Sequence, residues 1–269
     1  MVHLLLIDAM NLIRRIYAVQ ERPYAPLADE VADTTKAQIV TNTEQTLRQS
    51  LLRLQQELKP SHAALVFDGQ SSYWRRQLFA DYKANRKPMP SLLADALPRL
   101  QLVAKELGFV SLQQQDYEAD DIIASIATRM AKHQQQVTIA STDKGFLPLL
   151  SQQIQIYDTF NRQYNSSDSI HEKFGVQPSQ LVRYWSLVGD STNNIPGVPG
   201  IGPKTALEVL ALANTFSQAV QHESCHKKTA EKLIQHKADI LVFMQILSLK
   251  TDVEMGINLQ ELRLESNLA

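Results

Sequence analysis

Short apolar runs alternate with longer amphipathic stretches through the first 160 residues of the chain. The apolar runs are 4–7, 63–67, 109–112, 137–140 and 154–157, and the stretches between them include 46–58, 92–107 and 119–131. The short runs have the length and residue types of buried strands, and the longer stretches have helical periodicity. Strands that alternate with helices predict an α/β fold around a mostly parallel central sheet.

The strand pattern fades after about residue 165. Helix-like segments follow at 178–188, 204–213, 230–236 and 237–249, with no flexible linker before them. We therefore expect an α/β domain over residues 1–165 and a helical region over 166–269. The single cysteine, Cys225, excludes an intrachain disulfide framework and Cys-rich zinc motifs. No apolar run is long enough for a signal peptide or a membrane span, so we expect a cytoplasmic protein without membrane contact.

Three aspartates lie at or just beyond the ends of predicted strands. Asp8 and Asp68 directly follow the first and second strands, and Asp143 lies just beyond the fourth. Each one alone is better explained as a turn former or a helix cap. In parallel α/β sheets, however, ligands bind outside the carboxyl ends of the strands, so the three side chains are also positioned to meet.

A dense acidic cluster precedes the apolar helix predicted from residue 119. It contains Asp116, Glu118, Asp120 and Asp121. Favourable interaction with the helix dipole is one explanation, worth at most about 1 kcal/mol per charge. Two such charges 5 Å apart repel by about 3 kcal/mol at an effective dielectric constant of 20. If the cluster converges with Asp8 and Asp68, a divalent cation is the natural compensation. Oxygen ligands favour Mg²⁺ or Mn²⁺, and such a site suits phosphoryl chemistry.

Residues 73–90 form a basic segment with interleaved aromatic side chains. It carries a local charge of +4 on a chain whose net charge is −1. Basic groups neutralise phosphates and aromatic rings stack on unpaired bases, as in single-strand binders. A solvated amphipathic helix with its aromatic side chains in the core explains the same pattern, and the segment alone does not decide between the two.

Glycine and proline concentrate in one segment, 188–206. Four of the nine glycines lie between 189 and 202, and three of the eleven prolines lie between 196 and 203. Such density indicates tight turns before a helix. Small residues let backbone N–H groups approach a phosphate at the N-terminus of that helix. The segment therefore predicts a hairpin between two helices that contacts a nucleic acid backbone.

Four stretches together resemble the bacterial 5′-nuclease family. They are "VGDSTNNIPGVPGIGPKTA" (188–206), "YKANRKPMP" (82–90), "EADD" (118–121) and "STDKGFLPLL" (141–150), and the likeness extends from Asp8 to about Leu249. The family includes the N-terminal domain of DNA polymerase I and phage 5′-nucleases, and is related to eukaryotic flap endonucleases. The chain carries no polymerase module, so it is most similar to the free-standing members. The resemblance implies a nuclease domain with an arch at about 69–105 and a helix–three-turn–helix element at about 178–213.

The resemblance also implies a set of site residues. The first metal site maps onto Asp8, Asp68, Glu118, Asp120 and Asp121, and the second onto Asp143 and Asp190. Lys83, Arg86 and Asp120 take the catalytic positions. DNA contacts fall on Arg15, Tyr82, Lys83, Arg86, Gly200, Ile201, Gly202, Pro203, Lys204 and Thr205. A potassium ion in the helix–three-turn–helix element would take main-chain carbonyls of Leu187, Val188, Pro196, Val198 and Ile201.

Two positions depart from the family pattern. Gly145 and Asn193 stand where the family has second-site aspartates, so we expect a firm first metal site and a second ion that binds weakly or through water. The expected function is Mg²⁺-dependent cleavage of 5′ flaps or 5′ ends of DNA, in replication or repair, by a monomer without a small-molecule cofactor. The alternative is a protein that binds flap DNA and cleaves it little or not at all. A ribonuclease on a similar acidic domain is a third reading, but it would lack both the arch and the hairpin.

Overall fold

The computed structural model describes residues 2–24, 31–70 and 73–264. Six strands form one sheet in the order β3-β2-β1-β4-β5-β6. The pairings are parallel except that of β5 with β6. The strands are β1 (His3–Asp8), β2 (His62–Phe67), β3 (Val110–Gln113), β4 (Gln136–Ala140), β5 (Ile154–Asp158) and β6 (Gln163–Tyr164). The prediction of an α/β fold with a mostly parallel sheet is confirmed.

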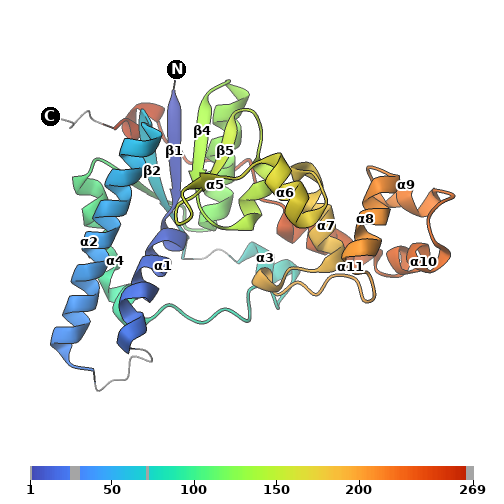
Figure 1. The fold of residues 1–269 in the computed structure, drawn as a ribbon, viewed down its shortest axis with the longest axis horizontal. Helices are drawn as coiled ribbons and strands as arrows, with labels where there is room; N and C mark the ends of the chain where they lie inside the picture. The colour runs from blue at the N-terminus through green and yellow to red at the C-terminus, as the bar shows by residue number, and fades with distance from the viewer. Residues whose placement is uncertain (1, 25–30, 71–72, 265–269) are drawn as a thin grey trace.

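Helices cover both faces of this sheet (Figure 1). Leu5 and Ile7 of β1 pack into a core with α1 (Ala9–Glu21), α2 (Asp33–Leu58) and α4 (Ser91–Glu106). The alternate residues Leu4 and Leu6 face α5 (Ala119–Lys132) on the other side, in a core that continues into the C-terminal helices. Side chains alternate along a strand, so an apolar run such as that of β1 is buried on both faces.

The C-terminal region is helical, as predicted from the pattern. Its helices are α6 (Ser167–Phe174), α7 (Leu181–Val188), α8 (Pro203–Leu212), α9 (Phe216–Gln221), α10 (Lys227–Gln235) and α11 (Lys237–Leu247). Short 3₁₀ turns complete the described chain: η1 (Arg22–Tyr24), η2 (Lys144–Leu149), η3 (Pro178–Gln180), η4 (Ser191–Asn193) and η5 (Leu259–Leu262). Among these helices, none has both the length and the apolar character needed to cross a membrane.

The predicted arch, 69–105, divides into two parts; its residues 71 and 72 lie outside the described residues. The first part contains the five-residue helix α3 (Trp74–Leu78), followed by turns and irregular chain. That chain runs from α3 past the end of α1 to α4 (Figure 1). The second part is α4 itself, which packs on α2 in the core of the α/β domain. The segment that is free to contact a ligand therefore ends where α4 begins.

Two glycines allow the turn between α7 and α8 to form. Gly197 has a φ of +73°, and a Cβ there would lie 2.4 Å from the amide nitrogen of Gly189 and 2.6 Å from the carbonyl oxygen of Leu187. Gly189 has a φ of +88° and meets the carbonyls of Ile195 and Pro196 in the same way. Only glycine permits both the left-handed backbone and this close approach. The turn is thus pressed against the C-terminal end of α7.

Candidate active site

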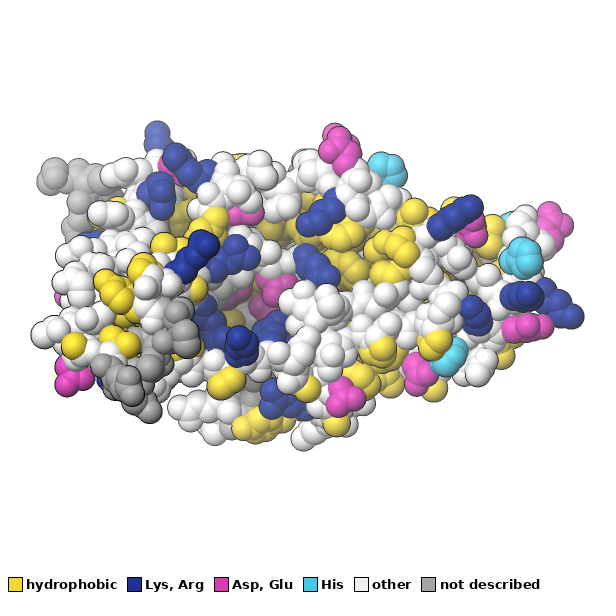
Figure 2. Space-filling view, turned by 60° about the horizontal axis from the view of Figure 1, so that its bottom comes forward, with side chains coloured by type: hydrophobic (Ala, Val, Ile, Leu, Met, Phe, Trp, Pro, Cys, Tyr) yellow, Lys and Arg dark blue, Asp and Glu magenta, His cyan; other side chains and the backbone are white. Residues whose placement is uncertain are grey.

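A cleft of about 580 Å³ opens at the carboxyl edge of the sheet. Figure 2 shows a hollow with acidic side chains inside it and basic side chains around its mouth. The carboxylates come from Asp8, Asp68, Glu118, Asp120 and Asp143, and the cations from Arg14, Arg15, Arg76, Lys83, Arg86 and Lys87. Five of the seven residues predicted to bind metal therefore share one cleft.

The sheet order brings the three strand-end aspartates together. β1 lies between β2 and β4, so Asp8 is flanked by Asp68 and by the loop that carries Asp143. The Asp8 carboxylate accepts hydrogen bonds from the Asn11 amide at 3.1 Å and the Ser141 hydroxyl at 2.9 Å. Asp8 is therefore also the N-cap of α1. The two explanations of these aspartates, cap and cleft ligand, are compatible, and Asp8 serves both.

Asp68 joins the second strand to α5. Its Oδ1 accepts a hydrogen bond from the Ala119 amide at 2.9 Å. The bond holds the first turn of α5, which carries Asp120, against the end of β2. The acidic cluster is thus tied directly to the strand-end aspartates.

Two acids of the cleft have raised pKa values. Burial, with smaller contributions from the charges of Asp68 and Asp143, raises the pKa of Asp8 to about 7. Burial also raises the pKa of Asp120 well above its ordinary value, and the charges of Asp143 and Asp8 add to this effect. Desolvation and like charges both disfavour the carboxylate form. A bound cation removes that penalty, and hard oxygen donors suit Mg²⁺ or Mn²⁺.

Lys83 pairs with two of the cleft acids. Its Nζ is 3.0 Å from Glu118 Oε1 and 3.9 Å from Asp120 Oδ2. Burial lowers the pKa of Lys83, but the two carboxylates outweigh burial and hold that pKa above its ordinary value. Among the described residues, no three acidic, histidine or cysteine side chains are placed so that they could hold one metal ion without moving. Lys83 shares Glu118 and Asp120 with any ion that binds there.

The structure separates Asp121 from the other predicted metal ligands. Asp121 is fully buried, and its two oxygens accept hydrogen bonds from the Arg75 guanidinium at 2.6 and 2.8 Å. The indole of Trp74 and the amide of Lys250 donate to the same carboxylate. Four donors inside the protein bond this carboxylate, and Asp121 does not line the cleft; its assignment to the first metal site stays a prediction.

Tyr82 is also internal. It is 5% exposed, and its hydroxyl donates to Glu118 Oε2 at 3.0 Å. Phe79 stacks edge-on against Phe243 in the core, and Trp74 bonds Asp121. Of the four aromatic residues in this segment, only Tyr73 is exposed. The predicted DNA contact of Tyr82 does not agree with this burial; the aromatic residues mainly anchor the segment, which is the core explanation of the sequence pattern.

The remaining predicted DNA contacts lie on the surface. Arg15 and Arg86 are exposed at the mouth of the cleft. The loop at 190–194 is joined to the basic segment by four hydrogen bonds. The donors and acceptors are the Lys83 amide and the Asn193 carbonyl, Asn85 and the Ser191 carbonyl, Asn194 and the Asp81 carbonyl, and Arg86 and the Asn193 side-chain oxygen. These bonds fix the backbone that carries Lys83 and Arg86 against the turn that precedes the hairpin.

The acids of the predicted second metal site, Asp143 and Asp190, bond to other protein groups. Asp190 is buried, and its Oδ1 lies 2.7 Å from Lys144 Nζ. The side-chain amide of Asn193 donates to Asp190 Oδ2 at 2.7 Å. Asp143 accepts from the amide of Gly145 at 2.8 Å. The structure thus places a lysine on Asp190, and Asn193 meets this aspartate as a donor and not as an oxygen ligand.

Part of the hairpin backbone, at 200–205, is exposed to solvent next to the carbonyls predicted to bind potassium. Gly200, Gly202, Pro203 and Lys204 are exposed and Thr205 is half-buried, whereas the Ile201 side chain is 4% exposed. Gly202 is the N-cap of α8 with no side-chain cap, and Pro203 begins the helix. The first amides of α8 are therefore available to an anion. Of the carbonyls predicted to bind potassium, those of Leu187 and Val198 accept the Val198 and Ile201 amides.

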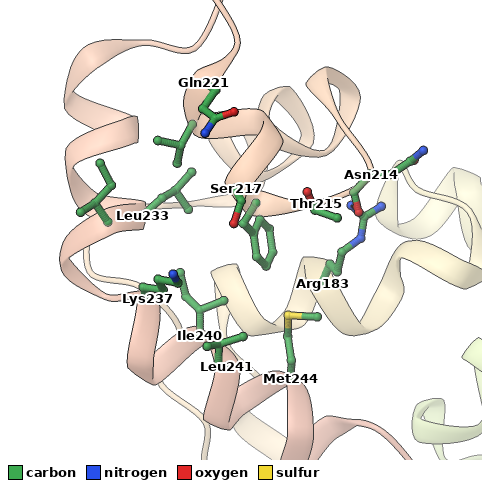
Figure 3. Close-up of a pocket in the computed structure, with 13 residues that line it drawn as sticks. Arg183, Asn214, Thr215, Ser217, Gln221, Leu233, Lys237, Ile240, Leu241 and Met244 are labelled. Carbon is green, nitrogen blue, oxygen red and sulfur yellow. Dashed lines mark hydrogen bonds between the residues drawn. The ribbon is translucent and has the colours of Figure 1, made fainter.

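A second pocket, of about 480 Å³, lies among α7, α9, α10 and α11 (Figure 3). Leu233, Ile240 and Met244 give it an apolar lining, and none of its lining residues carries a carboxylate. It lacks the convergent charged groups of the sheet-edge cleft. The cleft is therefore the site where phosphoryl chemistry is possible.

Three cations of the cleft were not among the site residues predicted from the sequence. Arg14, Arg76 and Lys87 line the cleft beside the predicted Arg15, Lys83 and Arg86. The adjacency of Arg14 to Arg15 in the sequence, shortly after the first strand, was an available signal. No local sequence pattern indicated the ion pairs of Arg75 and Lys144, because their partners Asp121 and Asp190 each lie 46 residues further along the chain.

Comparison with known families supports a nuclease architecture. Residues 3–175 match the family described as 5′-3′ exonuclease, N-terminal resolvase-like domain, and residues 176–268 match 5′-3′ exonuclease, C-terminal SAM fold. The chain is 45% identical to flap endonuclease Xni of Colwellia psychrerythraea over 98% of this chain and 93% of that protein. It is 40% identical to flap endonuclease Xni of Vibrio cholerae over 99% and 98% of the two chains.

Solved structures share the fold. The T5 D15 protein co-crystallised with metal ions superposes with a TM-score of 0.71 at 18% identity, over 93% of this chain and 90% of that one. T5 5′-exonuclease with bound zinc gives a TM-score of 0.73 at 17% identity, over 91% and 89%. The acidic cleft on a parallel sheet, with a basic rim and a hairpin between helices, defines a protein of the nuclease class. The chain belongs to the 5′-3′ exonuclease family, as the sequence resemblance predicted.

Proposed function

We propose that this chain is a Mg²⁺-dependent, structure-specific nuclease that cleaves 5′ flaps or 5′ ends of DNA, in replication or repair. The observation that carries the proposal is the cleft in which five carboxylates face a rim of six lysines and arginines. Acids and bases at this density suit a cation and a phosphate at the same place. Family membership and the names of the relatives support the same activity.

Asp8, Asp68 and Asp120 would hold the first divalent ion, with Glu118 and Asp143 beside them. Such an ion, when bound, lowers the pKa of water and offsets the charge that develops on phosphate oxygens. The residues of the chain supply the rest. Lys83 is poised to donate to a phosphate oxygen, because its ammonium projects into the cleft and is already held by Glu118. Its charge is worth more there than in water, since the side chain is only 12% exposed.

The rim and the hairpin would bind the DNA on either side of the cleft. Arg15 and Arg86 contact phosphates of the strand that enters the cleft, and such contacts give affinity without sequence preference. The exposed backbone at 200–205 would contact the duplex, where the N-terminus of α8 favours phosphate. Because the cleft would bind the strand and the hairpin the duplex, the protein would prefer DNA with a duplex next to a 5′ strand.

A potassium ion is part of the proposal for the hairpin. The carbonyls of Leu187 and Pro196 both point into the Gly189–Gly197 contact, where they lie 2.6 and 2.8 Å from the positions that a Cβ of Gly197 or Gly189 would take. Neutral carbonyl oxygens that gather at a backbone contact without side chains suit a monovalent cation. Val188, Val198 and Ile201 complete the proposed main-chain set.

A cleavage assay on flap, nicked and single-stranded DNA across a Mg²⁺ titration tests the function. Asp120→Asn keeps the shape of the side chain and removes its charge, so it should abolish cleavage of a 5′ flap while circular dichroism shows an unchanged fold. Asp116→Asn is the matched control, since Asp116 belongs to the same acidic cluster but does not line the cleft. Cleavage by Asp120→Asn at the wild-type rate would refute the assignment.

The pairing of Asp190 with Lys144 favours one alternative, a protein that binds flap DNA and cleaves it little. The second group of acids would then have lost its catalytic use while the rim and the hairpin still bind DNA. Tight binding of flap DNA in Ca²⁺, together with no cleavage in Mg²⁺ or Mn²⁺, would establish that alternative. Sedimentation of the free protein tests the proposed monomer.

A further inference from the structure

The pocket of about 480 Å³ among α7, α9, α10 and α11 has no part in the nuclease chemistry proposed above. Its volume lies within the range of about 300–1,000 Å³ that is typical of ligand pockets in proteins. Leu233 and Ile240 are buried in its lining, whereas Ile234 and Leu241 are 62% and 56% exposed. Exposed apolar side chains that gather around a cavity are typical of a surface that binds another molecule.

Two cations flank the apolar lining. Figure 3 shows Arg183 and Lys237 on opposite sides of the pocket. The Nη1 of Arg183 donates to the carbonyls of Ala213 and Asn214. Among the described residues, neither cation forms an ion pair with an acid. Burial lowers the pKa of Arg183, with no carboxylate charge to oppose that effect. The pocket therefore favours a ligand that carries negative charge beside apolar groups.

One wall of the pocket is polar. Asn214, Ser217 and Gln221 are exposed there, on the turn before α9 and on α9 itself. Figure 3 shows Ser217 and Gln221 across the pocket from Leu241. Amide and hydroxyl side chains donate to and accept from a peptide backbone. A fatty acid or another amphiphile with a single charged end offers nothing to this wall, so the wall favours a peptide.

We propose that this pocket is a docking site for an acidic segment of a partner protein that carries a large apolar side chain. The apolar side chain enters the pocket, and carboxylates beside it pair with Arg183 and Lys237. Asn214, Ser217 and Gln221 bond the backbone of the segment. The guanidinium of Arg183 makes the stronger of the two charged contacts, because its planar fork can bind a carboxylate through two nitrogens.

Fluorescence anisotropy with labelled peptides tests the proposal on the full chain. The probes are fluorescein-labelled Glu-Asp-Glu-Leu-X, in which X is Leu, Phe or Trp, and at least one of them should bind. Glu-Asp-Glu-Ser-Ser has the same acidic residues and reports attraction to the basic rim of the cleft. Gln-Asn-Gln-Leu-X reports apolar contact without charge. Each of these control peptides should bind at least about tenfold more weakly than the best probe.

Variants with matched controls locate the binding. Leu241→Asp places an acid between the two cations, so it should weaken binding of the best probe by at least about tenfold. Leu102→Asp is its control, because Leu102 is 53% exposed on α4 and does not line the pocket. Lys237→Gln removes one of the paired charges and should also weaken binding. Lys227→Gln should not, since Lys227 is exposed on α10 outside the pocket.

Three results would overturn the proposal. The first is that no probe binds, or that Leu241→Asp and Lys237→Gln leave binding unchanged. The second is that octanoate, added as a competitor, binds as tightly as the best probe, which would assign the pocket to a free carboxylic acid. The third is a dimer of the wild-type chain in sedimentation that Leu241→Asp abolishes, which would assign the pocket to a second copy. None of these measurements needs cleavage, so a chain that binds the probes but cleaves no DNA would refute only the proposed function.

Discussion

Arg75 should be the most stabilising single charge near the cleft. Its side chain is 2% exposed and donates five hydrogen bonds: two to Asp121, one to Glu118, and one each to the carbonyls of Ile246 and Ser248. It thereby joins α3 to the start of α5 and to the end of α11. Arg75→Met keeps most of the volume and removes the charge, which leaves Asp121 buried without its partner.

The expected cost follows from that burial. Removal of one partner from a buried ion pair destabilises a protein by about 3–5 kcal/mol, because the remaining charge cannot be solvated. Two acids lose their partner here, while Glu118 keeps Lys83 and Tyr82. We therefore expect a loss in the free energy of unfolding of about 3–5 kcal/mol for Arg75→Met, measured by urea denaturation of the metal-free protein.

The neighbouring arginine provides the control. Arg76 is exposed at the mouth of the cleft, so Arg76→Met should leave the free energy of unfolding within about 0.5 kcal/mol of the wild type. Arg75→Met combined with Asp121→Asn should recover part of the loss, since the second change removes the unpaired charge. A loss below about 1 kcal/mol for Arg75→Met would refute the reasoning, because such values are typical of exposed ion pairs.

Three further predictions concern the cleft and the hairpin. The folded-state pKa of Asp8, about 7, exceeds its unfolded value. In the presence of a chelator, the stability that this group contributes should therefore fall as pH rises from about 4 to 7. Thermal melts should show the opposite trend in Mg²⁺, and Asp8→Asn should remove the contribution of Asp8 to the pH dependence. Gly145→Asp combined with Asn193→Asp should lower the Mg²⁺ concentration for half-maximal cleavage, because the two added carboxylates supply oxygen ligands beside Asp143 and Asp190. A Cβ at 145 would lie 3.2 Å from Asp143 Oδ1, which requires only a small displacement. An unchanged Mg²⁺ requirement would contradict this prediction. Gly197→Ala should lower the free energy of unfolding, measured by urea denaturation, by about 1–3 kcal/mol and should weaken duplex binding. Gly202→Ala is the control: its Cβ would have nothing within 4 Å, so the free energy of unfolding should change little.

The convergence of the strand-end acids was predictable because it depends on topology alone. Parallel strands end at the same edge of a sheet, so aspartates directly after β1 and β2 must be neighbours once those strands pair. The side-chain partners were not predictable in this way. Asp121 and Asp120 are adjacent in the chain, yet one faces Arg75 in the core and the other faces the cleft. Which of them turns inward depends on where α3 and α11 pack, and no local pattern records that.

The basic segment shows why a count of charges misleads about partners. Its excess of positive charge suggests a surface for phosphate, but Arg75 neutralises acids inside the protein and Lys83 is shared with Glu118. Arg76, Arg86 and Lys87 remain for the ligand. The same holds for the acids: Asp121 has an arginine and Asp190 a lysine, so they do not add their charge to the cleft. The field that a phosphate meets therefore depends on which charges the protein has not neutralised internally. Asp8, Asp68 and Asp120, of which only Asp120 lies near Lys83, face the exposed arginines. This is the part of the site where a cation and a phosphate can bind together.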